Sequence, residues 1–279
     1  MEKEKTISFA GAVKEELCRV PLSRKCCAQA EAYGVLLFCN TFRGDEIKIM
    51  TESVAFAQRL PVLFKKAFKV TFDRLPDGEG KYIFVINDPK KLAAVLQVYG
   101  AAPSDVALHI NFAVVEEECC RASFFRGAFL AGGSVTDPRK GYHLELATSH
   151  RGVSREVPVL LAEMEFQPKS AQRKGNSITY FKQSEHIEDF LIAIGAPLTA
   201  MEVMNAKLEK SLRGGREPPG ELRRRQPGQG GGGGPEPAGG HPALTGGRPA
   251  EQPAGQAEAG GSAPTGESRG HAVPAGGAV

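Results

Sequence analysis

The chain has 279 residues and a formal net charge of +3, from 35 Lys and Arg against 32 Asp and Glu. It contains no run of the roughly 18 to 20 apolar residues that a membrane-spanning helix needs, and its charged amino terminus lacks an apolar signal region. These features exclude a membrane protein, so we expect a soluble protein of the cytoplasm. The small basic excess permits nucleic acid binding without requiring it.

Capping signals and hydrophobic periodicity predict the elements of the first half of the chain. Ser8 is a typical N-cap residue, and Gly100 is placed to end a helix. In chain order the predicted elements are a helix over 9–18, a helix over 26–40, a strand over 46–51, a helix over 54–68, a hairpin of strands over 69–75 and 81–87, and a helix over 89–99.

The same series returns in the second half, where Gly195 is placed to end a helix. The predicted elements are a helix over 119–133, a strand over 143–148, a helix over 154–166, a hairpin of strands over 169–173 and 177–182, a helix over 184–194 and a trailing helix over 200–212.

The two halves also match in sequence, which indicates a tandem duplication. The segment from Cys26 to Gly34 recurs from Cys119 to Gly127 at an offset of 93 residues, and later matches lie at offsets of 95 and 97. We therefore expect an α+β fold built as a pseudo-twofold tandem repeat. Its parts are a lead-in with one helix (1–24), a first repeat (25–105), a connector (106–118), a second repeat (119–199), a trailing helix (200–213) and a tail (214–279).

Small residues mark the predicted contact between the repeats. Gly34 and Gly127 lie at matched places in the first helix of each copy, although a mid-helix Gly costs roughly 1 kcal/mol relative to Ala. Because both copies have this destabilising glycine at the same place, we expect the two helices to approach each other closely there. We predict that Gly34, Gly127 and Ala131 form this interface.

Six cysteines occur, at positions 18, 26, 27, 39, 119 and 120. In a reducing compartment they are thiols rather than disulfides. The two adjacent pairs could suggest a metal site, but zinc ligands usually lie two to four residues apart, and no nearby His pair completes a set. We therefore interpret the cysteines as small buried apolar side chains, and we expect no metal and no cofactor.

Two units that meet through glycine-containing helices resemble the LAGLIDADG homing-endonuclease fold. The run from Arg126 to Val135, with Gly132-Gly133-Ser134 near its end, more narrowly resembles the bacterial WhiA family. The resemblance covers roughly residues 8–213. It is also carried by segments 8–9, 13–17, 26–28, 142–145, 180–182, 194–196 and 203–205.

The resemblance implies a DNA-binding transcriptional regulator of sporulation, cell division and chromosome segregation in Gram-positive bacteria. Its expected partner is double-stranded DNA at promoter regions, and its expected location is the nucleoid. Homing endonucleases end each motif helix with an acidic metal ligand, but the matching positions here are Cys39 and Gly132. Asp45 and Asp137 follow several residues later, in loops. We therefore expect no catalytic residue and no enzyme activity.

Cations on the open faces of the two sheets, or in their loops, are candidates for phosphate contacts. The candidate DNA-binding residues are Lys48, Arg74 and Lys81 in the first repeat, and Arg139, Lys140, Arg173, Lys174 and Lys182 in the second. Taken singly, each is more simply a solvated surface charge, and Glu145 interrupts the second set.

The tail differs from the rest of the chain in composition. Residues 214–279 contain 20 of the 33 Gly and 10 of the 19 Pro, with four Leu and Val and no aromatic side chain. A segment that buries so little apolar surface cannot offset its chain entropy, so we expect disorder.

The start of the tail also suggests a shifted reading frame. WhiA-family chains continue at this point into a segment resembling Ser-Val-Asn-Arg-Arg-Val-Asn-Cys-Asp-Ala-Ala-Asn-Leu-Gly and then into a helix-turn-helix. Residues 216–229, back-translated with G/C-rich codons and regrouped by one base, read Val-Asn-Arg-Arg-Val-Asn-Cys-Asp-Ala-Ala-Asn-Leu-Gly. Our hypothesis is a frameshift near Gly214 that replaces the helix-turn-helix; a native linker is the alternative.

Two rival interpretations belong to other classes of protein. The repeat could be an interaction module that docks another transcription regulator, in which case a protein partner binds without DNA. A metal-dependent nuclease would instead require carboxylates near the groove between the sheets. A chain without the helix-turn-helix is expected to bind DNA weakly, through phosphates, with steep salt dependence.

Overall fold

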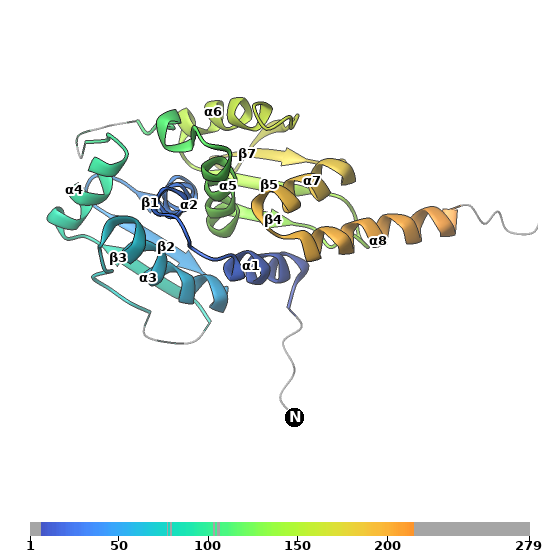
Figure 1. Ribbon diagram of the computed structural model, residues 1–279, viewed down its shortest axis with the longest axis horizontal. Helices are drawn as coiled ribbons and strands as arrows, with labels where there is room; N and C mark the ends of the chain where they lie inside the picture. Colours follow the sequence, from blue (N-terminus) through green and yellow to red (C-terminus); the bar gives the residue numbers. More distant parts are fainter. Residues whose placement is uncertain (1–6, 77, 79, 103, 105–106, 215–279) are drawn as a thin grey trace, which may run out of the picture. The chain divides into compact units, whose positions relative to one another are not determined.

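The computed structural model describes residues 7–76, 78, 80–102, 104 and 107–214, which all belong to the first of two units of the chain, Met1–Glu221. The expected disordered tail lies outside the described residues, apart from Gly214. The elements are α1 (Phe9–Arg19), α2 (Lys25–Phe38), β1 (Thr41–Phe42), β2 (Ile47–Thr51), α3 (Val54–Phe68), β3 (Tyr82–Ile86), α4 (Pro89–Val98), the 3-10 helix η1 (Phe112–Val115), α5 (Glu118–Gly132), β4 (Gly133–Val135), β5 (Leu144–Thr148), α6 (Arg151–Ala162), β6 (Lys169–Arg173), β7 (Asn176–Phe181), α7 (Ser184–Ile194) and α8 (Pro197–Gly214), as Figure 1 shows.

Each repeat combines helices with one antiparallel sheet. The first sheet has the strand order β1-β2-β3 and the second has the order β4-β5-β7-β6. Alternation along β2 and β5 buries every second residue, beginning with Ile47 and Leu144, against the helices. The predicted tandem α+β architecture is therefore present.

Helix starts differ between the repeats. Ser53 accepts a hydrogen bond from the backbone N–H of Phe56 at the start of α3, and Asp88 accepts from Lys90 and Lys91 at the start of α4. Helices α6 and α7 of the second repeat have no side-chain cap. The predicted Ser8 cap of α1 is confirmed, with 3.1 Å from its Oγ to the backbone nitrogen of Gly11.

Helices α2 and α5 make the most extensive contact between any two described elements. A Cβ placed on Gly34 would lie 2.0 Å from the carbonyl oxygen of Phe124, and one on Gly127 would lie 1.9 Å from that of Glu31. The two backbones touch where both glycines lie, so the predicted close approach is confirmed. Ala131 lies one turn after Gly127 on α5 and packs partly buried against the core.

One predicted strand is wrong. Residues 69–75 form no strand in the described part of the chain, and only Arg74 makes an isolated bridge to Val85. Phe72 packs in the core, where its ring centroid lies 4.6 Å from that of Phe64. The Asp73 carboxylate accepts hydrogen bonds from the backbone N–H groups of residues 87 and 88. Side-chain packing and capping thus replace a strand ladder. The sequence does not predict strands β1 and β4, because β1 has only two residues and β4 only three.

The first and last helices of the unit contact each other. The Glu16 carboxylate of α1 accepts hydrogen bonds from the backbone N–H groups of Leu198 (2.7 Å) and Thr199 (2.9 Å), in the first turn of α8. This side chain caps α8, which begins three residues earlier than the predicted trailing helix. None of the helices among the described residues has an apolar run long enough to cross a membrane.

Candidate nucleic-acid interface

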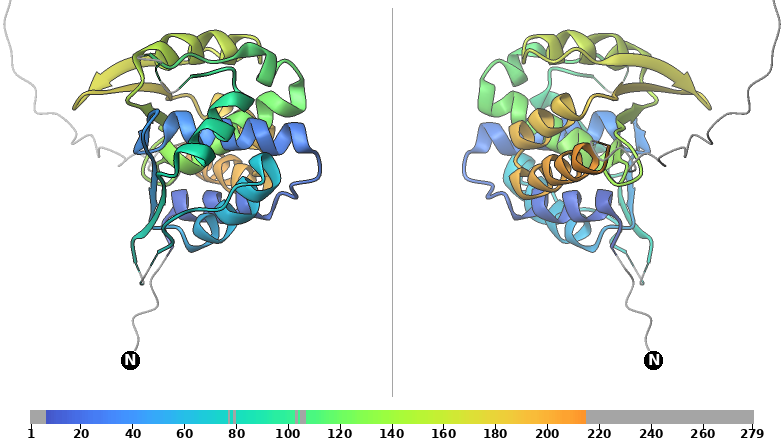
Figure 2. Two further views of the ribbon diagram at one scale, coloured as in Figure 1. Left: turned by 90° about the vertical axis from the view of Figure 1, so that its left-hand side faces the viewer. Right: turned by 90° about the vertical axis from the view of Figure 1, so that its right-hand side faces the viewer.

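The two sheets lie on the same side of the unit, to the left of α2 and α5 in the left-hand view of Figure 2. Because strand side chains alternate, the residues that do not point to the helices form an open face on each sheet. In the first sheet this face carries residues from three strands, none of them fully buried: Thr41, Lys48, Met50, Ile83 and Val85.

The open face of the first sheet brings two predicted cations together. Lys48 pairs with Val85 across β2 and β3, and Arg74 bridges Val85 from the other side. Residues directly opposite in an antiparallel pair point to the same face, so Lys48 and Arg74 flank Val85. Lys81 is exposed one residue before β3 begins.

The open face of the second sheet is dominated by an ion-paired carboxylate. Glu145 lies 2.6 Å from Arg173 Nη2 through Oε1 and 3.0 Å from His143 Nε2 through Oε2. Partial burial raises the pKa of Glu145, but the hydrogen bonds from His143 and Arg173 outweigh it and hold the pKa below its ordinary range. Arg173 therefore already has a counter-charge, which weakens its case as a phosphate ligand.

The remaining predicted cations surround this face. Lys182 lies over the Tyr180 ring, with Nζ 5.5 Å from its centroid. Lys174 occupies the tip of the β6–β7 hairpin at a φ of 51°, next to Gly175. Arg139 and Lys140 are exposed in the β4–β5 loop, which Asp137 stabilises by accepting from the backbone N–H of Arg139.

Neither degenerate metal position offers an oxygen ligand. Cys39 is buried, its thiol donates to the carbonyls of Leu36 and Thr41, and burial raises its pKa to about 12. At Gly132 an added Cβ would lie 2.5 Å from the carbonyl oxygen of Ala147, so no carboxylate side chain fits there without a shift of the backbone. An acidic side chain at Gly132 would also approach the carbonyl oxygen of Phe38, at 3.0 Å from its Cβ.

Comparison with known proteins identifies the family. A family model described as the WhiA LAGLIDADG-like domain matches residues 121–213. A probable cell division protein WhiA of Ruminiclostridium cellulolyticum is 34% identical over 218 residues, which covers 74% of this chain and 70% of the relative. The chain belongs to the WhiA family. A probable cell division protein WhiA of Bacillus cytotoxicus is 31% identical over 221 residues, covering 74% of this chain and 69% of the relative.

Solved WhiA structures have the same fold. The crystal structure of full-length WhiA from Thermotoga maritima matches with a TM-score of 0.59 at 22% identity, covering 73% of this chain and 67% of that one. The crystal structure of an N-terminal LAGLIDADG domain of WhiA matches with a TM-score of 0.54 at 22% identity, covering 70% of this chain and 94% of that one. The predicted LAGLIDADG-like fold is therefore confirmed, and the WhiA relatives are named as cell division proteins rather than enzymes.

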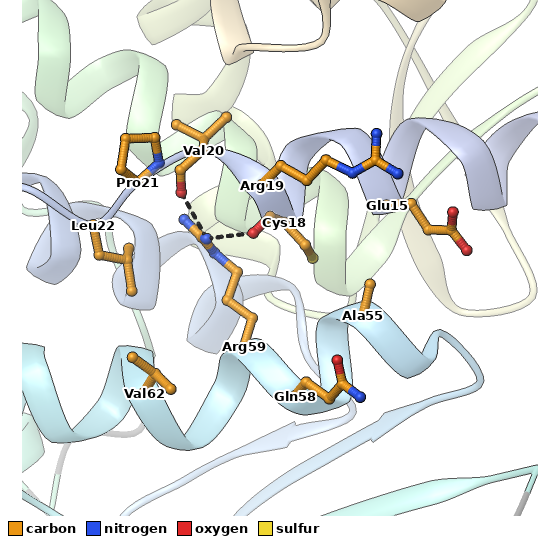
Figure 3. Close-up of a pocket in the computed structure, with 10 residues that line it drawn as sticks. All are labelled: Glu15, Cys18, Arg19, Val20, Pro21, Leu22, Ala55, Gln58, Arg59 and Val62. Atoms are coloured by element: carbon orange, nitrogen blue, oxygen red, sulfur yellow. Dashed lines mark hydrogen bonds between the residues drawn. The ribbon is translucent and has the colours of Figure 1, made fainter.

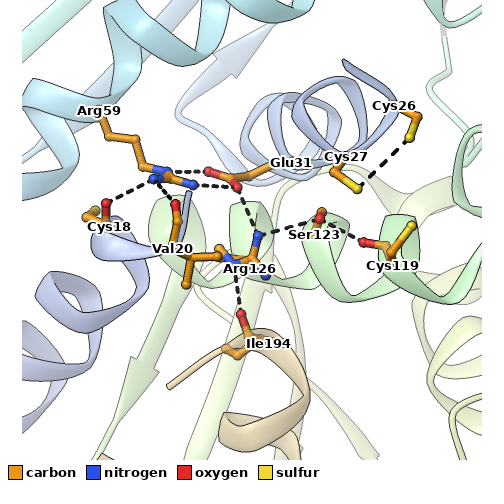
Figure 4. A network of polar contacts seen from close by, with 10 residues as sticks. All are labelled: Cys18, Val20, Cys26, Cys27, Glu31, Arg59, Cys119, Ser123, Arg126 and Ile194. Carbon is orange, nitrogen blue, oxygen red and sulfur yellow. Dashed lines mark hydrogen bonds and ion pairs between the residues drawn. The ribbon is translucent and has the colours of Figure 1, made fainter. Parts of the chain in front are cut away.

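A buried ion network that the sequence does not predict joins the repeats of this WhiA-family chain (Figure 4). The fully buried Glu31 carboxylate of α2 binds Arg59 of α3 through two bonds, of 2.5 and 2.9 Å, and Arg126 of α5 at 3.2 Å. Arg59 also donates to the carbonyls of residues 18 and 20, and Arg126 donates to that of residue 194. These carbonyls end α1 and α7, where the helix dipole is negative, and so offset the second guanidinium charge.

A hollow of about 560 Å³ opens beside this network, between α1 and α3 (Figure 3). Its lining is largely apolar, and Arg59 at its edge is already bound to Glu31 and two carbonyls. Burial raises the pKa of the lining thiol Cys18 to about 12, so Cys18 is a poor nucleophile.

Proposed function

We propose that this chain is a non-catalytic DNA-binding regulator of transcription that acts in cell division and sporulation. It binds double-stranded DNA at promoter regions, in the nucleoid, through the open faces of its two sheets. The observation that carries the proposal is the pair of antiparallel sheets on one side of the unit, with Lys48 on the central strand of one open face, Arg74 beside the edge strand of that face, and Lys182 on the other face.

Phosphate contacts fit this surface better than base contacts. The open face of the first sheet presents apolar side chains between its cations, among them Met50 and Val85, and such side chains offer no hydrogen bonds to base edges. Long cationic side chains reach phosphates without fixing a sequence. Binding is therefore expected to be weakly specific and to fall steeply with salt.

The positions that would bear catalytic metals support the non-enzymatic part of the proposal. Phosphodiester cleavage by two metals needs hard oxygen ligands at the ends of the motif helices. Here those ends carry the buried Cys39 thiol and Gly132, which is packed against a backbone carbonyl.

Fluorescence anisotropy with a labelled promoter duplex tests the DNA interface. We expect log Kobs to fall linearly with log salt between 50 and 200 mM, and Lys48→Ala to reduce that slope by about 0.9, the loss of one phosphate contact. Lys65→Ala is the matched control, because Lys65 is an exposed lysine on α3, which packs on the covered side of the first sheet. No binding at 50 mM salt would overturn the proposal, and equal slopes for Lys48→Ala and Lys65→Ala would remove Lys48 from the interface.

Helix α8 favours a second candidate, the docking of another transcription regulator. Four exposed apolar side chains recur along one side of this helix: Leu198, Met201, Leu208 and Leu212. An amphipathic helix of this kind suits a groove on a partner. A regulator that binds wild type but not Leu208→Glu, in the absence of DNA, would favour docking over DNA binding.

A further inference from the structure

Four cysteines far apart in the sequence meet at one end of the α2–α5 contact. The Sγ atoms of Cys26, Cys27, Cys119 and Cys120 all lie within 4.8 Å of one another, and those of Cys26 and Cys27 are 4.0 Å apart. The prediction that these cysteines act as buried apolar side chains is wrong for Cys26, which is exposed. Zinc spacing rules apply to ligands on one loop, whereas here each helix supplies one adjacent pair.

The spacing of the four sulfurs fits a single tetrahedral metal ion. A Zn–S bond of about 2.3 Å places the sulfurs of a tetrahedral site about 3.8 Å apart, and thiolates are the ligands of closed structural zinc sites. The present separations need to contract by no more than about 1 Å, which rotation of the side chains can supply.

Burial raises the pKa of Cys27 and Cys120, but two features of the surroundings offset the negative charge of a tetrathiolate. The cysteines occupy the second and third positions of α2 and α5, and Figure 4 shows Cys26, Cys27 and Cys119. Neither helix has a side-chain hydrogen bond that caps its first turn. Free N–H groups and the positive end of the helix dipole stabilise anions at such places. The guanidinium of Arg24 adds a full charge, with Nη1 3.9 Å from Cys119 Sγ.

We propose that Cys26, Cys27, Cys119 and Cys120 together bind one Zn²⁺ ion that fastens the first turn of α2 to the first turn of α5. Because all four ligands come from the protein, the metal is structural and no position stays open for substrate. Binding displaces the thiol protons, which leave to solvent, and the partial exposure of Cys26 and Cys119 gives the ion a path inward.

Metal analysis of the full chain tests the site. Protein purified under reducing conditions and passed over a desalting column after equimolar Zn²⁺ is expected to retain one zinc per chain by mass spectrometry. Replacement by Co²⁺ is expected to give the intense thiolate-to-metal charge-transfer and visible d–d bands of a tetrahedral sulfur site. The absence of both zinc and these bands in the folded wild type would overturn the proposal without any variant.

Two substitutions locate the ion. Cys26→Ser removes an exposed ligand, so the fold is expected to persist by circular dichroism while zinc retention against a competing chelator falls at least about 10-fold. Cys18→Ser is the matched control, because Cys18 is a partly buried cysteine outside the cluster, and it is expected to retain zinc as wild type does. Equal retention by both variants, or recovery of the cluster as two disulfides that bind no metal even after reduction, would contradict the site.

Discussion

In the first repeat the motif helix contributes Glu31, the buried centre of the ion network, whereas 93 residues later the second motif helix has Phe124 at the matching place. Arg59 in α3 binds that carboxylate, and its counterpart 97 residues later, Glu156, instead accepts from His109 and the backbone N–H of Ile110. The glycines, by contrast, are the same in both copies. Close backbone contact across a pseudo-twofold axis needs a small residue on both helices, whereas a single buried carboxylate is enough to pair with both arginines.

The largest expected effect tests the matched part of this comparison. Gly34→Ala and Gly127→Ala each place a Cβ about 2 Å from a backbone carbonyl of the other helix, and the helices must move apart to accept it. We expect each variant to lose at least about 4 kcal/mol in the free energy of unfolding, enough to prevent folding of a marginal domain.

Urea denaturation measures this loss, and Gly141→Ala is its control. An added Cβ at Gly141 meets no atom within 4 Å, so that variant is expected to stay within about 0.5 kcal/mol of wild type. A severe effect at only one of the two motif glycines would show that the helix contact is not reciprocal.

The next effect tests the part that differs. Glu31→Gln keeps the shape of the side chain but leaves Arg59 and Arg126 buried without a counter-charge, which we expect to cost about 3 to 5 kcal/mol. Glu156→Gln, at the matching place of Arg59, removes a partly exposed charge and is expected to cost about 1 kcal/mol. Thermal unfolding of the two variants side by side checks the difference. Equal losses would mean that burial of the Glu31 network does not increase the cost of removing its carboxylate charge.

A smaller effect concerns the hairpin, which only the second repeat completes. Gly175 follows Lys174 in the β6–β7 turn at a φ of 86°, a backbone conformation that disfavours a side chain. We expect Gly175→Ala to lower the free energy of unfolding by about 1 kcal/mol. Amide hydrogen exchange should show faster exchange in β6 and no change in β2; an unchanged β6 would mean that the turn does not hold the hairpin.

The smallest effect is pH-dependent and belongs to the open face of the second sheet. The pKa of Glu145 is lower in the folded chain than in the unfolded one, so its contribution is complete near neutral pH and is lost as the pH falls through the folded pKa. Because Arg173 is 61% exposed, we expect less than about 1 kcal/mol. Wild type and Glu145→Gln should differ in melting temperature at pH 7 and converge once the pH has fallen below the folded pKa of Glu145; a difference that stays constant with pH would place the stabilisation elsewhere.

The sequence alone predicts the repeat and its glycine contact, because both depend on local periodicity and on an identity between copies. It does not predict the ion network, since Glu31 and Arg126 lie 95 residues apart and each resembles an ordinary surface charge in its own helix. The sequence does not predict the cysteine cluster either, because its two pairs, at positions 26–27 and 119–120, are also far apart in the chain. The strand predicted over 69–75 is wrong for a different reason, because the alternation in this segment does not reveal its tertiary contacts. Phe72 packs against the rings of Phe64 and Phe84, and the Asp73 carboxylate accepts a hydrogen bond from the backbone N–H of Asn87.

The Glu16 cap of α8 has a consequence for how the chain folds during synthesis. Residues 16 and 199 are separated by 183 positions, so the cap can form only after almost the whole unit has left the ribosome. Contacts of such long range are late and slow, because the intervening chain must be ordered before they form. While the chain is being synthesised, α1 therefore lacks its contact with α8 until α8 has been made. The hydrogen bonds between Glu16 and α8 form at the end of folding rather than at its beginning.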